Sequence, residues 1–213
     1  TEITTSPLAA IKFATGTDIG MRREENQDSH GVVETENFRV FVVADGMGGV
    51  QGGGTASGIA VDTVRQMIGD RRQVSELEIT SALTQANSEI FERGNSNPEL
   101  TGMGTTCVGL AFIETRMFIF NVGDSRAYRI RKGKTTQLTQ DHTLVMELVR
   151  SGALSLEQAG NHPVSHMLTR SLGPGPQIEV DCELCADGPA RGDYYLLCSD
   201  GLYNLVSPDE FAS

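Results

Sequence analysis

Four aspartates lie at or near the ends of predicted strands, with glycine close by, and could do chemistry together. They are Asp28 in ENQDSHG, Asp45 in VVADGMGG, Asp124 in FNVGDSRAY and Asp200 in LLCSDGL. Carboxylates gathered in one place repel each other unless they are protonated or bridged by cations. Mg²⁺ and Mn²⁺ prefer such oxygen ligands, including a backbone carbonyl like that of Gly46. A single Asp-Gly pair is most often a turn, and spacing alone does not show that the four converge.

A glycine-rich turn follows Asp45, with six glycines among residues 46–54. It resembles a phosphate-binding loop, but Thr55 follows Gly54 directly, so the lysine of a P-loop is missing. The charge here is negative and would repel bare phosphate. The sequence therefore favours indirect binding, in which metal ions held by Asp45 and Gly46 hold the phosphate. Arg23 could add a bidentate contact to it, or could instead form a surface ion pair with a neighbouring glutamate.

The elements that must position these residues are readable from periodicity. Residues 38–45 form an apolar run typical of a buried strand. Apolar residues recur at helical spacing over 59–68 and 79–90. Short β-type runs follow over 105–139, with a hairpin predicted at Gly133. Because there is no βαβ alternation, the pattern predicts an α+β fold of antiparallel sheets covered by helices.

The second half of the chain has weaker signals. Strands are predicted at 177–182 and 194–198, and the polar segment 142–176 reads as an insertion over a site. Ser207 begins a helix signature, Ser-Pro-Asp-Glu, that has only three residues after it. We therefore expect the chain to be truncated at its C-terminal end.

Composition excludes several classes of function. The 213 residues carry a net charge of −11, which disfavours binding to nucleic acid or to anionic membranes. No segment reads as a signal peptide or a membrane span. The cysteines read as reduced cytosolic thiols, and the lone Cys182-x-x-Cys185 pair is weak evidence for metal or redox chemistry. We expect a cytoplasmic protein.

Six segments in order resemble the motifs of PP2C-type (PPM) metal-dependent protein Ser/Thr phosphatases, and they cover residues 17–206. The DGMGG form is similar to the bacterial branch of this family. The segments are DIGMRREENQD, VVADGMGGVQGGGTAS, GTTCVGL, FNVGDSRAYRIRKGKTTQLTQDH, LTRSLG and LLCSDGLYNLV.

The resemblance implies one PP2C-like catalytic domain over 1–213, a β-sandwich of two antiparallel sheets flanked by helices in α-β-β-α layers. It implies that two Mn²⁺ or Mg²⁺ ions bind at one edge of the sandwich. Asp45 would bridge the two ions, the Gly46 carbonyl would bind one of them, and Asp200 would hold the other. Asp28 would act through or beside metal-bound water. Asp124, with Asp200, matches positions that bind a third, weaker ion in bacterial members.

The resemblance also implies an activity. Water bridging two ions would attack phosphoserine or phosphothreonine in a protein, with Arg23 clamping the phosphate. Residues 142–172 would form the flap that is linked to substrate choice in the family. The partners would be phosphoproteins modified by a Ser/Thr kinase, and we expect a monomer.

The sequence departs from the family pattern at several positions. Val50 and Gly54 replace a histidine and a glutamate after DGMGG, Met47 replaces the histidine proposed as general acid in eukaryotic members, and Gln27 replaces a glutamate found in some members. The last metal aspartate of the family would lie beyond Ser213. An alternative is therefore a pseudophosphatase, a phosphoprotein-binding or regulatory module with little turnover.

Overall fold

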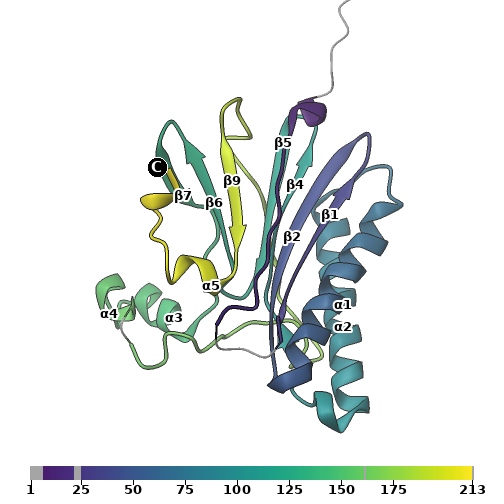
Figure 1. Cartoon of the computed structure of the whole chain (residues 1–213), viewed down its shortest axis with the longest axis vertical. Coiled ribbons are helices and arrows are strands. Elements are labelled where there is room, and N and C mark those ends of the chain that lie inside the picture. The colour runs from purple at the N-terminus through teal and green to yellow at the C-terminus, as the bar shows by residue number, and fades with distance from the viewer. Residues whose placement is uncertain (1–6, 22–24, 161, 213) are drawn as a thin grey trace, which may run out of the picture.

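The computed structural model describes residues 7–21, 25–160 and 162–212. Arg23, the predicted phosphate clamp, lies outside these residues. Two antiparallel sheets stand side by side, and a pair of long helices covers the outer face of the first (Figure 1). The predicted α+β sandwich is confirmed.

The first sheet has six strands. Its order is β1-β2-β4-β5-β8, with the two-residue strand β3 paired to the end of β2. On β2, buried and half-buried residues alternate, because one face meets the helices and the other meets the second sheet. The strands are β1 (Asp28–Glu34), β2 (Phe38–Met47), β3 (Gly104–Thr105), β4 (Cys107–Ile113), β5 (Arg116–Val122) and β8 (Asp181–Leu184).

Helices α1 (Gly49–Gly69) and α2 (Glu76–Ser96) pack against that sheet (Figure 1). Both were predicted from their apolar spacing. Ser75 caps α2 with a capping box, in which its side chain accepts from the backbone and Glu78 returns the contact. Fully buried aliphatic and aromatic side chains, including Phe38 of β2, fill the space between helices and sheet.

The second sheet has three strands in the order β7-β6-β9, namely β6 (Arg126–Arg131), β7 (Lys134–Gln137) and β9 (Tyr194–Cys198). The β6–β7 turn is the predicted hairpin. Lys132 and Gly133 both have positive φ, 53° and 75°, as a two-residue turn matching strand twist requires. A second apolar cluster lies between the two sheets.

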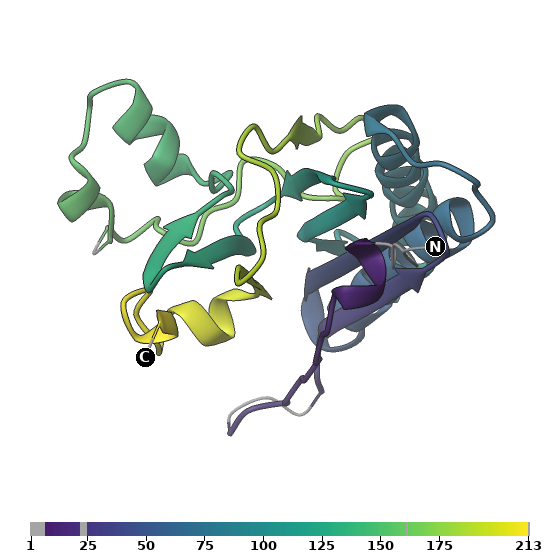
Figure 2. The same ribbon diagram turned by 90° about the horizontal axis from the view of Figure 1, so that it is seen from above.

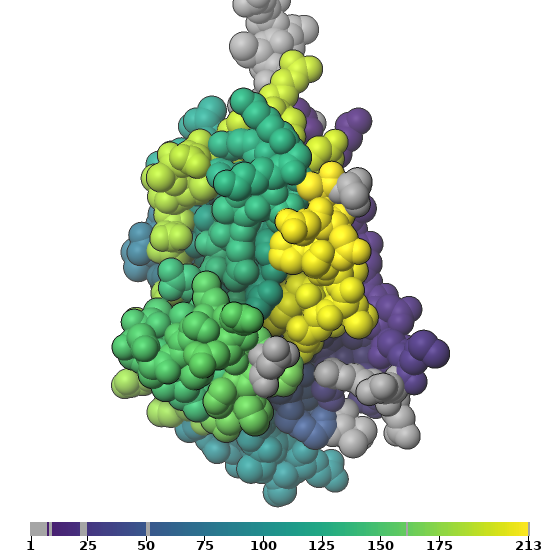
Figure 3. All heavy atoms as spheres, turned by 90° about the vertical axis from the view of Figure 1, so that its left-hand side faces the viewer, coloured from purple at the N-terminus to yellow at the C-terminus, as the bar shows by residue number. Residues whose placement is uncertain are grey.

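The segment between β7 and β8 has little regular structure, as expected. It carries α3 (Leu144–Arg150) and α4 (Leu156–Gly160). Seen from above, these helices project to the side opposite α1 and α2 (Figure 2). In the space-filling view they form a mass below the second sheet, beside the yellow C-terminal residues (Figure 3). The last helix, α5 (Asp200–Tyr203), follows β9.

One strand boundary was predicted wrongly. The strand expected at 177–182 is β8, which begins only at Asp181 and pairs with β5 over four residues. Gln177, Ile178 and Glu179 instead line a cavity. Near the C-terminus, Ser207 does pair with Glu210 as the capping signature predicted, and a 3₁₀ turn at Glu210–Ala212 follows.

Candidate metal-dependent active site

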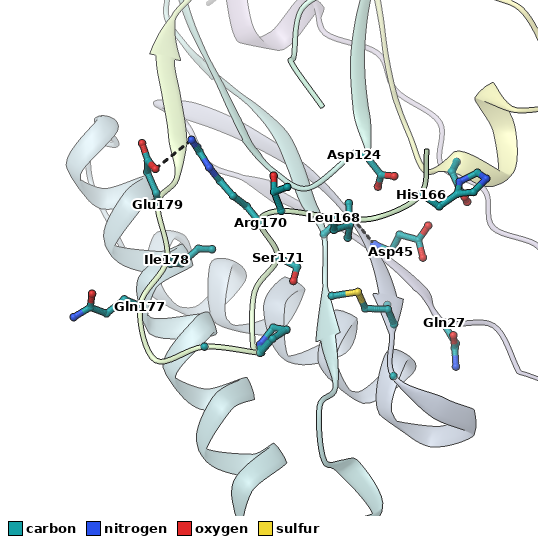
Figure 4. Close-up of a pocket in the computed structure, with 18 residues that line it drawn as sticks. Gln27, Asp45, Asp124, His166, Leu168, Arg170, Ser171, Gln177, Ile178 and Glu179 are labelled. Carbon is teal, nitrogen blue, oxygen red and sulfur yellow. Dashed lines mark hydrogen bonds and ion pairs between the residues drawn. The ribbon is translucent and has the colours of Figure 1, made fainter. Parts of the chain in front are cut away.

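A cavity of about 950 Å³ opens at the lower end of the first sheet, where β2 ends. Figure 4 shows the Asp45 and Asp124 carboxylates on the right of it and, on the left, the side chains of Arg170, Gln177, Ile178 and Glu179. Asp200 also lines it. The cavity therefore brings together residues that lie far apart in the sequence.

Strand register places Asp28 beside Asp45. The two residues are directly paired across β1 and β2, and the charge of Asp28 helps to raise the pKa of Asp45. Ser199, which precedes α5, donates its hydroxyl to Asp28 Oδ2 at 2.7 Å. This contact ties the start of β1 to the segment that carries Asp200.

The backbone around Asp45 is fixed on several sides. Its N–H donates to Thr106 Oγ1 and its carbonyl accepts from Thr106 N, both at 2.9 Å. Thr106 Oγ1 also lies 2.7 Å from Ser125 Oγ, next to Asp124. A short hydrogen-bonded chain through buried hydroxyls thus connects the residues that carry two of the carboxylates.

Glycine is required at position 46 because of close packing. A Cβ there would lie 2.0 Å from the carbonyl oxygen of Gly53 in α1. The glycine-rich turn thus lets the first turn of α1 approach the end of β2. The glycines here allow close contact between the backbones of β2 and α1. This agrees with the interpretation that the turn does not bind phosphate directly.

Burial and neighbouring carboxylates raise the pKa of two of these aspartates, Asp45 and Asp124. Burial, followed by the charges of Asp28 and Asp200, raises the pKa of Asp45 to about 8. Burial, followed by the charges of Asp141 and Asp200, raises the pKa of Asp124 to about 6. Such raised values mean that the negative charge is poorly compensated by the protein itself. A divalent cation would relieve this repulsion.

The donor set fits hard divalent ions, since it consists of carboxylate oxygens with backbone carbonyls nearby. Within the described part of the chain, no three histidine, cysteine, aspartate or glutamate side chains are already gathered closely enough to hold an ion. Asp28, Asp45, Asp124 and Asp200 are the residues that could hold it, with the Gly46 carbonyl.

A cation braces the region beside Asp124. Arg126 forms a bidentate contact with Asp141, with its shortest distance 2.7 Å from Nη2 to Oδ2. Its guanidinium also lies 3.7 Å from the ring centroid of Tyr203, one helical turn after Asp200. Arg126 thereby connects β6 to α5.

The structure adds cavity residues that the sequence did not single out. His166, Thr106 and Arg170 line the cavity, and Ser199 contacts Asp28. A hydroxyl or a lone cation has no local sequence pattern that marks it. Only the presence of Thr106, Arg170 and Ser199 inside motif segments could have pointed to them.

The Cys182-x-x-Cys185 pair does not form a shared site. Cys182 packs against the cluster under α1 and α2, whereas Cys185 packs against the cluster between the sheets. Their side chains thus pack on opposite faces of the first sheet, and both thiols are free.

A search of the described helices for a candidate membrane span found none.

Comparison with known proteins identifies the family. The profile of the protein phosphatase 2C family matches residues 15–213. A "Serine/threonine phosphatase stp" of Listeria monocytogenes serotype 4b is 39% identical over 200 residues, covering 91% of this chain and 79% of that protein.

Solved structures agree with this match. The S. agalactiae serine/threonine phosphatase has a TM-score of 0.83 at 34% identity, covering 92% of this chain and 81% of its own. The catalytic domain of PstP in complex with 2 manganese ions has a TM-score of 0.77 at 32% identity, covering 91% and 79%. A sandwich with carboxylates at its edge, a family match over nearly the whole chain and these likenesses agree: the chain belongs to the protein phosphatase 2C family.

Proposed function

We propose that this protein removes phosphate from phosphoserine and phosphothreonine in proteins. It would use divalent ions held where Asp45, Asp124 and Asp200 line the cavity, which we call its carboxylate end. Membership of the family makes the chain a metal-dependent Ser/Thr protein phosphatase. The observation that carries the assignment of the site is the cluster of carboxylates around Asp45, whose pKa is raised to about 8 by burial and by its acidic neighbours.

We assign roles by position. Asp45, the Gly46 carbonyl and Asp200 would hold two Mn²⁺ or Mg²⁺ ions, and Asp124 with Asp200 would hold a third, weaker ion. Asp28, held by Ser199, would orient the attacking water by accepting its hydrogen bond. The ions, when bound, supply a water of lowered pKa and positive charge opposite the phosphate.

Phosphate orientation falls to an arginine. Arg170 lines the cavity, but its guanidinium already binds Asp181 at 2.8 Å and Glu179 at 3.1 Å. That pairing leaves Arg170 poorly suited to clamp a substrate. We therefore keep Arg23, which precedes Asp28 by five residues, as the proposed phosphate clamp.

The pseudophosphatase alternative is not favoured. Val50 and Gly54 still depart from the family pattern, but the relatives at this level of identity are named as phosphatases. The four predicted carboxylates are also present, and three of them line one cavity. Loss of function would be expected to remove such ligands first.

Several broader features belong to the same proposal. The chain acts as one catalytic domain, with residues 142–172 as a flap that influences substrate choice. It opposes a Ser/Thr kinase. Free thiols at all four cysteines support a cytoplasmic location, and a net charge of −11 supports a monomer.

The test is hydrolysis of a phosphothreonine peptide in Mn²⁺, measured by phosphate release. Asp45→Asn should lower kcat by about a thousandfold or more, because it removes several kcal/mol of charge stabilisation. EDTA should abolish wild-type turnover, and Asp62→Asn, on the exposed face of α1, should leave it unchanged. Turnover that survives both EDTA and Asp45→Asn would refute the proposal.

A further inference from the structure

One buried histidine connects the two sides of the cavity. His142 is only 2% exposed and lies just before α3. Its Nδ1 accepts from the Gly123 N–H at 3.1 Å, and its own N–H donates to the Gly123 carbonyl at 3.0 Å. Gly123 immediately precedes Asp124 and has a φ of +106°. Two hydrogen bonds from one residue therefore fix the turn that presents Asp124.

The tautomer of His142 follows from these contacts. Because Nδ1 accepts from Gly123, the ring hydrogen must be on Nε2. Nε2 lies 3.0 Å from Asp181 Oδ2, so it donates to that carboxylate. Asp181 in turn accepts from Arg170 at 2.8 Å. One ring nitrogen thus faces the turn that presents Asp124. The other faces the chain on the opposite side, residues 168–181, which we call the wall.

Backbone bonds make the same connection. His142 O accepts from Thr169 N at 2.9 Å, and Thr143 pairs with Leu168 in an isolated bridge. Further along that wall, Leu172 exchanges both backbone bonds with Thr105, whose hydroxyl donates to the Asp45 carbonyl. The wall from 168 to 172 is thereby attached to the segments that carry Asp45 and Asp124.

We propose that His142 is a positioning residue that holds the Gly123–Asp124 turn for cation binding and couples it to the Arg170 wall. This rests on the metal role proposed above for Asp124. The Nδ1 contact serves the turn and the Nε2 contact serves the wall, so the two can be separated by substitution. A residue that merely filled space would show no such separation.

Two amides distinguish the contacts. In His142→Asn the side-chain oxygen stands near the former Nδ1 and can still accept from Gly123, whereas the bond to Asp181 is lost. In His142→Gln the amide reaches toward Asp181, but Gly123 N–H is left without its acceptor. His30→Gln, at an exposed position of strand β1, is the matched control.

The experiment is a calorimetric titration of each metal-free protein with Mn²⁺, with thermal unfolding measured alongside. We expect His142→Gln to weaken the Asp124-dependent Mn²⁺ step about tenfold, as loss of a group supporting a ligand does. His142→Asn and His30→Gln should stay within about twofold of wild type. In an Asp124→Asn background, His142→Gln should add no further loss, since the two share one effect.

Other outcomes are decisive as well. Equal losses in His142→Asn and His142→Gln, or a full extra loss in the Asp124→Asn background, would overturn the positioning role. Wild-type protein that binds Mn²⁺ while His142→Gln binds it equally well would do the same. Wild-type protein that binds no Mn²⁺ would instead refute the proposed function itself.

Discussion

The two sides of the cavity differ in whether their charged side chains form ion pairs. At the wall, Arg170 is paired with Asp181 and Glu179, and His142 donates to Asp181. At the carboxylate end, no ion pair between described residues reaches Asp45, Asp124 or Asp200. The charges of the wall are paired without a ligand, whereas our proposal requires the carboxylate end to gain stability when a cation binds.

The pKa shifts express the same contrast. Burial and acidic neighbours raise the pKa of Asp45 to about 8. At the wall, burial would raise the pKa of Asp181, but the hydrogen bond from His142 and the charge of Arg170 outweigh it and lower the pKa. One carboxylate is destabilised in its ionised form by folding and the other is stabilised. Substitutions at the two ends should therefore act with opposite sign.

The largest effect is expected at Asp45. In EDTA at pH 8, Asp45→Asn should raise the free energy of unfolding by about 3 kcal/mol, less than the full pKa shift implies because water and counterions reach the cavity. Urea unfolding followed by circular dichroism measures it. Asp62→Asn is the control, and a destabilised Asp45→Asn protein would contradict the contrast.

The pH dependence comes next. The folded pKa of Asp45 lies above its unfolded value, so between them the folded state binds more protons and loses stability as pH rises. We expect the metal-free protein to lose about 2 kcal/mol between pH 6 and pH 8. Asp45→Asn should flatten this slope. A wild-type stability that rises over the same range would show that the carboxylates are compensated without metal.

The smallest effect is expected at the wall. Asp181→Asn should lower the free energy of unfolding at pH 7 by only about 0.5–1 kcal/mol, since half of the side chain is exposed and its ion pairs are screened. The folded pKa lies below the unfolded value, so this contribution is present at neutral pH and lost in acid. Thermal unfolding at pH 7 and pH 3 checks it. An Asp181→Asn protein that is as stable as wild type at pH 7 would show that the ion pairs of Asp181 do not stabilise the fold.

Local patterns predicted much of this architecture. The apolar run that became β2, the two helices and the Gly133 hairpin each carry their signal within a few residues. The four aspartates could also be picked out locally, because each has a glycine within a few residues. Their convergence was not local, because it depends on the pairing of Asp28 with Asp45 and on a hydrogen bond from Ser199 to Asp28 across 171 residues.

The wall was harder to predict for the same physical reason. The roles of His142 and Arg170 arise only when β8 brings Asp181 beside them. The expected strand at 177–182 failed because its first residues line the cavity, while pairing with β5 begins at Asp181. Sequence alternation records which residues favour an extended chain, and tertiary contacts decide where pairing starts.

The central claim is that the carboxylate end is a cation site whose charge the fold leaves uncompensated. Calorimetric titration of metal-free protein with Mn²⁺ at pH 7, in two buffers of different protonation enthalpy, tests it most directly. Since burial and acidic neighbours raise the pKa of Asp45 to about 8, ion binding should release about one proton more per chain from the wild type than from Asp45→Asn. Mn²⁺ binding with equal proton release in the two proteins would contradict the account.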